Sequence, residues 1–98
     1  HTLFSRPYAQ AVAGRIEIMK IDTKNKIFNL SFIPDYSIKE PTIIYINNEL
    51  YYPYGYILSV EPKDIKYKVI EKEKNYLYIY IQKSKSKIIN IKIISKNQ

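Results

Sequence analysis

The chain has 98 residues, enough for one domain with a modest hydrophobic core of its own. It contains no cysteine, which excludes disulfides and thiolate metal sites, and its single histidine, His1, argues against imidazole catalysis or a multi-histidine metal site. The formal net charge of +7 is carried almost entirely by lysine in a chain rich in Ile, Asn and Tyr, so we attribute it to composition rather than to nucleic-acid binding.

Short segments that alternate between apolar and polar residues, separated by turn residues, predict seven to eight β-strands. After a first stretch of different composition at residues 3–15, the expected strands are 15–21, 27–33, 42–46, 56–60, 65–70, 76–82 and 88–94. No stretch has a capped helical period, so we expect negligible helix. This pattern predicts an all-β, immunoglobulin-like antiparallel sandwich that occupies residues 1–98 as a single domain.

Local details of these segments give further expectations. Ile16 and Ile18 should share one face of their strand, and the turn chemistry of residues 22–25 should join strands 15–21 and 27–33 into a hairpin. Residues 50–56 read as a loop or bulged edge, because Pro53 and Gly55 interrupt them. The lysine-rich loop at 83–87 protects exposed edges from pairing with other chains.

The stretch at residues 3–15 differs in composition from the rest of the chain. It holds every alanine (Ala9, Ala11 and Ala13), both arginines (Arg6 and Arg15) and Gly14. Alanines at alternate positions should share one face of an extended segment and allow close approach of a flat neighbour. Guanidinium groups make bidentate contacts that ammonium groups cannot. We therefore expect a docking strand, with an ordinary first strand bent at Gly14 as the alternative.

No catalytic constellation is visible in this chain. The carboxylates lie in turns or at polar strand positions, and two glycines cannot build a phosphate-binding loop. A second candidate surface is the group Tyr51, Tyr52, Tyr54 and Tyr56, whose rings could contact a sugar or a lipid interface. The alternative is that these rings pack over a sheet edge. A free-standing carbohydrate- or lipid-binding module and a basic nucleic-acid-binding barrel are the competing functional classes.

Residues 6–14, reading RPYAQAVAG and preceded by Leu3 and Phe4, resemble the start of the C-terminal β-sandwich of glycoside hydrolase family 5 enzymes of the endoglycosylceramidase type. Residues 50–60 are similar to a Tyr-Pro…Gly-Tyr element that leads into a strand in that family. Residues 16–33, followed by Pro34-Asp35, are similar to its strand, Asp-rich turn and strand. The resemblance covers about the first two-thirds of the chain.

The resemblance implies a non-catalytic accessory domain of a retaining glycosidase that acts on glycolipids, endoglycosylceramidase- or glucosylceramidase-like. It implies a (β/α)8 barrel upstream in the same chain, with Arg6, Pro7, Tyr8 and the alanines in the connecting strand. The family's two catalytic glutamates belong to that barrel, so no catalytic residue, metal or cofactor is expected here. The implied partners are the barrel and a glycolipid or membrane surface, and the implied location is secretory, endolysosomal or membrane-associated. Because the chain starts with His1, we expect it to be a segment of a longer polypeptide.

Overall fold

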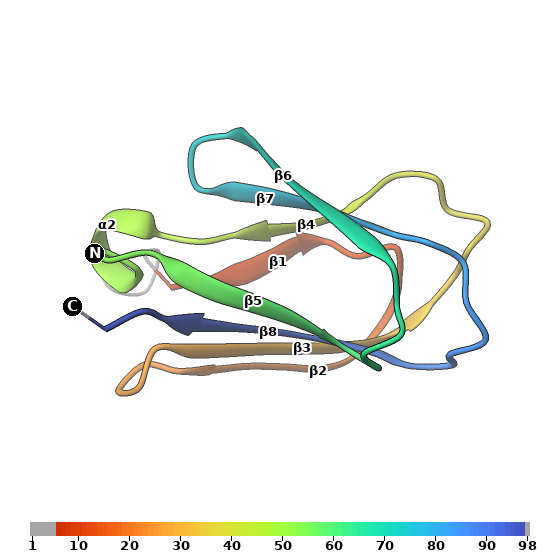
Figure 1. The fold of residues 1–98 in the computed structure, drawn as a ribbon, viewed down its shortest axis with the longest axis horizontal. Coiled ribbons are helices and arrows are strands. Elements are labelled where there is room, and N and C mark those ends of the chain that lie inside the picture. Colours follow the sequence, from red (N-terminus) through yellow and green to blue (C-terminus); the bar gives the residue numbers. More distant parts are fainter. Residues whose placement is uncertain (1–5, 98) are drawn as a thin grey trace.

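The computed structural model describes residues 6–97, which form a sandwich of two antiparallel four-stranded sheets (Figure 1). Sheet A has the strand order β1-β4-β7-β6, and sheet B has the order β2-β3-β8-β5. The strands are β1 (Tyr8–Ala11), β2 (Gly14–Asp22), β3 (Ile27–Pro34), β4 (Thr42–Tyr45), β5 (Tyr56–Glu61), β6 (Tyr67–Glu73), β7 (Tyr76–Ile81) and β8 (Ile89–Ser95). The prediction of an all-β sandwich is confirmed.

The core lies between the two sheets and comes from the alternate residues of the central strands. In sheet B, Phe28, Leu30 and Phe32 of β3 lie opposite Ile93, Ile91 and Ile89 of β8, and all six are buried. Sheet A contributes Ile44 of β4 with Leu77 and Ile79 of β7, each completely buried. A fully buried side chain of this size contributes roughly 1.5–3 kcal/mol to folding, so these four strands supply most of the hydrophobic stabilisation.

The β2–β3 hairpin is confirmed, and the Asp22 carboxylate organises its turn. Its Oδ1 accepts hydrogen bonds from the backbone amides of Lys24 (3.1 Å) and Asn25 (3.0 Å). These bonds hold the pKa of Asp22 below its usual value, first through the Asn25 amide and then through the Asn25 side chain. The left-handed backbone in this turn falls on Lys26, with φ of 57°.

The prediction that Ile16 and Ile18 share one face of their strand is wrong. A β-bulge between these residues places Ile16 opposite the buried Phe32 and Ile18 opposite Ser31. An extra residue in one strand reverses the alternation after it. Ile16 therefore lies on the core side of sheet B, whereas Ile18 lies on its outer side.

One other expectation fails locally, and one holds only in part. Strand β6 begins at Tyr67, because Ile65 closes a turn by donating its amide to the Pro62 carbonyl (3.1 Å) and is itself buried. Of the two alternatives for residues 50–56, the loop is correct for residues 52–55, which connect to β5, and the bulged edge strand is wrong. The first two residues of this range instead belong to α2 (Asn48–Tyr51), a one-turn helix whose Leu50 amide is capped by the Asn47 side chain at 3.1 Å. The part of the chain that the structure describes has no helix able to cross a membrane.

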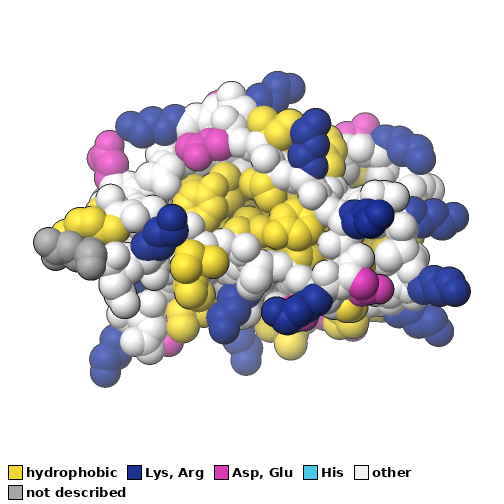
Figure 2. Space-filling view, viewed as in Figure 1, with side chains coloured by type: hydrophobic (Ala, Val, Ile, Leu, Met, Phe, Trp, Pro, Cys, Tyr) yellow, Lys and Arg dark blue, Asp and Glu magenta, His cyan; other side chains and the backbone are white. Residues whose placement is uncertain are grey.

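One long side of the sandwich is bordered by β5 in sheet B and β6 in sheet A, the strands nearest the viewer in Figure 1. Figure 2 shows hydrophobic side chains in the shallow opening between these two edges, with basic side chains (dark blue) around it. Leu58 and Val69 lie on the core side of β5 and β6 and are only partly buried. The core is therefore less completely covered on this side than at its centre.

Candidate functional site

The predicted docking stretch forms β1 and the crossover from sheet A to sheet B. Residues 3–5 lie outside the described part of the chain. Strand β1 is an edge strand of sheet A and pairs with β4, with Tyr8 opposite Tyr45 and Ala9 opposite Ile44. Pro7, just before it, is buried. The expectation of an extended segment at this position is therefore met, while its docking role stays a prediction.

The prediction that Ala9, Ala11 and Ala13 share one face of an extended segment is wrong. The register of β1 shifts between Ala9 and Ala11, so that Ala9 lies opposite the buried Ile44 and Ala11 lies opposite its neighbour Ile43. The two alanines therefore lie on different faces of sheet A. Ala9 packs against the core, whereas Ala11 is exposed on the outer side of sheet A. The cause is an irregularity of the β-bulge type, as in β2.

The crossover itself is tightly fixed at Ala13 and Gly14. The Ala13 amide donates to the buried Thr42 hydroxyl (3.1 Å), and the Ala13 carbonyl accepts from the Asp35 amide (3.1 Å). A Cβ atom on Gly14 would overlap the carbonyl oxygen of Ile33. Glycine is therefore required by the close approach of two backbones, and the alternative of a Gly-assisted bend describes this residue well.

The two arginines that flank the stretch are exposed and unpaired within residues 6–97. The ion pairs of the described chain are Lys63–Glu61 at 3.8 Å and Lys74–Glu49 at 3.3 Å, and neither includes Arg6 or Arg15. Both guanidinium groups are thus available to a carboxylate or carbonyl outside this part of the chain.

The cluster Tyr51, Tyr52, Tyr54 and Tyr56 does not form one exposed surface. Tyr51 and Tyr52 belong to the core, at 7% and 2% exposure, and the Tyr52 ring packs against those of Tyr51 (6.2 Å) and Tyr56 (6.1 Å). Tyr56 is half-buried, while Tyr54 is 56% exposed. Two of these four rings are therefore too buried to stack on a sugar or enter a lipid interface, which supports the packing alternative for them.

Tyr52 carries a buried hydroxyl with no hydrogen-bond partner among residues 6–97. Burial, and secondarily the neighbouring Tyr51, raises the pKa of Tyr52 to about 12. The phenol therefore stays neutral at physiological pH, and its role in the described chain is packing.

A different group of tyrosines lies on the outer face of sheet A. Tyr8 of β1, Tyr45 of β4 and Tyr76 of β7 are cross-strand neighbours. Their ring centroids are 5.3 Å apart for the first pair and 5.4 Å for the second, with tilts of 36° and 58°. Partial burial, followed by the nearby Tyr8 phenol, raises the pKa of Tyr76. We call these three residues the tyrosine row.

Tyr78, two residues after Tyr76 on β7, connects the tyrosine row to side chains of β6. The Tyr78 hydroxyl donates to Glu73 Oε1 (3.1 Å), and the Lys72 ammonium lies 5.8 Å from the centre of its ring. The sequence did show that the tyrosines of β7 share a face. The missing information was the pairing of β1 with β4 and of β4 with β7, since these strands are distant in sequence.

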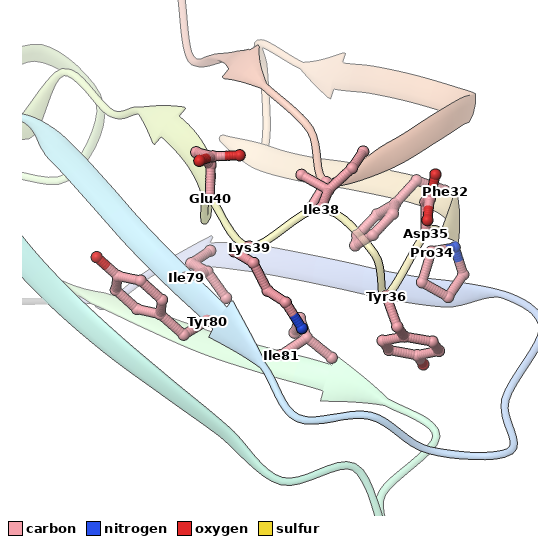
Figure 3. Close-up of a pocket in the computed structure, with 11 residues that line it drawn as sticks. Phe32, Pro34, Asp35, Tyr36, Ile38, Lys39, Glu40, Ile79, Tyr80 and Ile81 are labelled. Carbon is pink, nitrogen blue, oxygen red and sulfur yellow. The ribbon is translucent and has the colours of Figure 1, made fainter.

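A small cavity lies next to the crossover (Figure 3). Its lining comes from Ala13, the end of β3, the β3–β4 connection and the end of β7. The volume is about 70 Å³, far below the roughly 300 Å³ at which small-molecule sites begin. It cannot hold a sugar ring.

The described carboxylates support turns rather than chemistry. Asp35 accepts hydrogen bonds from the hydroxyl (2.6 Å) and amide (3.0 Å) of Ser37, which together lower its pKa. Among residues 6–97 no three His, Cys, Asp or Glu side chains gather in a way that could hold a metal ion.

Comparison with known proteins identifies the family. The model of the glycoside hydrolase family 5 C-terminal domain matches residues 6–93, nearly the whole chain. This chain belongs to that family.

Two curated relatives are the endoglycoceramidases of Hydra vulgaris, 41% identical over 73 residues, and of Cyanea nozakii, 39% identical over 71 residues. The alignments cover 74% and 70% of this chain but only 14% of either relative. The chain therefore spans about one-seventh of the length of these relatives.

Solved structures share the fold. Endo-glycoceramidase II from Rhodococcus sp., in its ganglioside GM3 complex, matches 94% of this chain with a TM-score of 0.70 and 21% identity, over 19% of its own length. Sterylglucosidase 1 from Cryptococcus neoformans matches 94% of this chain with a TM-score of 0.72 and 14% identity, over 14% of its length. The same sandwich thus occurs as a small part of larger glycosidases.

Proposed function

We propose that this sandwich is the accessory C-terminal domain of a retaining glycoside hydrolase that acts on glycolipids, endoglycoceramidase- or glucosylceramidase-like. In this proposal it packs on and stabilises a catalytic (β/α)8 barrel of the same polypeptide. The observation that carries the proposal is the match of the family 5 C-terminal domain to residues 6–93. The relatives' names and the small share of each relative that this chain covers support it.

The docking stretch supplies the link to the barrel. Arg6 and Arg15 are exposed without ion pairs inside the described chain, and the backbone between them is fixed by Thr42 and Gly14. A rigid crossover flanked by two guanidinium groups suits a fixed orientation between neighbouring domains, since bidentate contacts impose direction as well as attraction. Pro7, Tyr8, Ala9, Ala11 and Ala13 belong to the same connecting segment.

A deletion experiment tests this role. The full polypeptide and a version lacking residues 6–98 would be compared for thermal unfolding and for hydrolysis of ganglioside GM3. We expect the truncated protein to unfold at a lower temperature or to be recovered largely insoluble. An unchanged melting temperature together with unchanged hydrolysis would overturn the stabilising role.

A contribution at the membrane surface is the second part of the proposal. It is supported by the net charge of +7, because basic side chains are attracted to anionic lipid headgroups. The test is co-sedimentation of the full polypeptide with anionic phosphatidylserine vesicles and with neutral phosphatidylcholine vesicles. Equal binding to both kinds of vesicle, with or without residues 6–98, would remove this part.

A further inference from the structure

The two outer faces of the sandwich differ in chemistry. The outer side of sheet A carries aromatic or aliphatic side chains in all four of its strands, and the charged residues Lys68 and Glu73 on this side belong to the edge strand β6. We call this set the tyrosine face, and it consists of Tyr8, Ile43, Tyr45, Ile70, Tyr76, Tyr78 and Tyr80. In a sandwich that had no neighbour, water would surround both outer faces equally, and we would expect the two faces to be similar in composition.

Sheet B provides the comparison within the same molecule. Two rows that cross all four of its strands on the outer side are mostly polar: Lys20-Asn29-Lys92-Ser59 and Ile18-Ser31-Asn90-Glu61. A third row, Asp22-Ile27-Ile94-Ile57, has three isoleucines but no aromatic ring. Aromatic rings are enriched where a protein surface is covered by a partner, and sheet A has them in quantity.

The tyrosine face is also largely preformed. The rings of the tyrosine row already contact one another, and Tyr78 is held between Glu73 and Lys72. Side chains fixed in this way lose little conformational freedom when a partner covers them. Tyr8 and Tyr80 nevertheless remain 40% and 37% exposed.

The position of β1 indicates which partner is available. Family members of this kind are C-terminal domains, so the rest of such a polypeptide precedes this sandwich. Tyr8 lies on β1, the first described strand, only two residues after Arg6. A domain joined ahead of Arg6 therefore enters next to sheet A, since two residues span at most about 7 Å.

We propose that the tyrosine face is the surface on which the preceding domain of the same polypeptide packs, with the tyrosine row at the centre of the contact. This inference rests on the proposed function and specifies its interface. The main contact is then made by sheet A, and the docking stretch contributes to it only through β1.

Two other surfaces compete for that role. The opening between β5 and β6 lies along the edges of both sheets farthest from β1 and β2 (Figure 2). Tyr67, the first residue of the edge strand β6, is 42% exposed. On the opposite side, Met19 of β2 is 46% exposed and its sulfur accepts from the Ala9 amide (3.4 Å). Neither surface has a row of packed rings, and each provides an exposed probe residue.

Hydroxyl-radical footprinting of the full polypeptide, read by mass spectrometry, distinguishes these surfaces without any substitution. Tyr8 and Tyr80 report on the tyrosine face, Tyr67 on the β5–β6 side and Met19 on the β1–β2 side. Tyr54, at 56% exposure, is the exposed reference. We expect Tyr8 and Tyr80 to be modified several-fold more slowly than Tyr54, and Tyr67 at a rate close to that of Tyr54.

The outcomes separate the interface from the function. Protection of Tyr67 or Met19 with free modification of Tyr8 and Tyr80 would overturn the tyrosine face as the interface but leave domain packing in place. Rapid modification of all four probe residues would overturn both the interface and the packing role. Protection of Tyr8 and Tyr80 in the full polypeptide, with free modification of Tyr67 and Met19, would support both.

Discussion

The amide nitrogen of Ala13 lies 3.1 Å from the hydroxyl oxygen of Thr42, a side chain with no exposed surface. This bond joins the crossover between the sheets to the first residue of β4. A buried hydroxyl is costly unless it is hydrogen-bonded, so the pair satisfies the hydroxyl and fixes the crossover at once.

Replacing Thr42→Val should remove the acceptor while keeping the shape of the side chain. We expect a loss of about 1–2 kcal/mol in the free energy of unfolding, because the Ala13 amide is left without a partner. Thr42→Ser is the matched control, since it keeps the hydroxyl. Amide hydrogen exchange at Ala13 should be fast in the valine variant and slow in the serine variant. Equal exchange in both would show that the bond does not hold the crossover.

Gly14→Ala should destabilise this domain although it adds only a methyl group. The new Cβ would overlap the Ile33 carbonyl oxygen, and backbone rather than a flexible side chain would have to move. We expect a loss of roughly 2–3 kcal/mol in urea unfolding. Gly55→Ala is the comparison: its φ of +97° is unfavourable for alanine, but the nearest side-chain atom, Lys96 Cδ, is 3.4 Å away. A smaller cost at Gly14 than at Gly55 would contradict this account.

Tyr52→Phe should leave stability unchanged or raise it by up to about 1 kcal/mol. The hydroxyl is buried without a partner in residues 6–97, and removing an unsatisfied polar group recovers part of its desolvation cost. Tyr52→Ala should instead destabilise by about 3–5 kcal/mol through loss of the ring. A clear loss of stability in the phenylalanine variant would mean that the hydroxyl makes a bond outside the described residues.

The strand pattern was predictable because alternation is a local property of the sequence. Leu77 and Ile79 alternate with the tyrosines of β7. In the structure Leu77 and Ile79 face the core, and the tyrosines lie on the opposite, outer face. The bulges after Ile16 and Ala9 were not predictable, since an extra residue is defined only against the partner strand.

The candidate surfaces depend still more on long-range pairing. The local sequence gives four similar tyrosines at 51–56, yet two become core residues when α2 folds over the end of the sandwich. The tyrosine row requires strands 1, 4 and 7 to lie side by side, and no local signal encodes that order.

Acid should destabilise the domain through its two turn carboxylates. Hydrogen bonds lower the pKa values of Asp22 and Asp35 in the folded chain below their usual 3.8. Groups with depressed folded pKa values contribute stability above pH 3.8 and lose it as the pH falls through the folded values. We therefore expect urea stability to decline below about pH 4 and the decline to be shallower in Asp22→Asn. An identical pH profile in that variant would exclude Asp22 as a contributor.

The last prediction compares two exposed isoleucines on edge strands of opposite sheets. Ile70 of β6 is 37% exposed on the tyrosine face, and Ile57 of β5 is 50% exposed on the outer face of sheet B. Exposed surface substitutions usually change stability by less than about 0.5 kcal/mol, so lysine at either position should disturb the sandwich little by itself. If the preceding domain covers the tyrosine face, Ile70→Lys buries an unpaired charge in the full polypeptide and Ile57→Lys does not. We expect a lower melting temperature and increased radical modification of Tyr8 and Tyr80 in the Ile70 variant only. An unchanged melting temperature in both variants, or an equal decrease in both, would show that the preceding domain does not distinguish the tyrosine face from the outer face of sheet B.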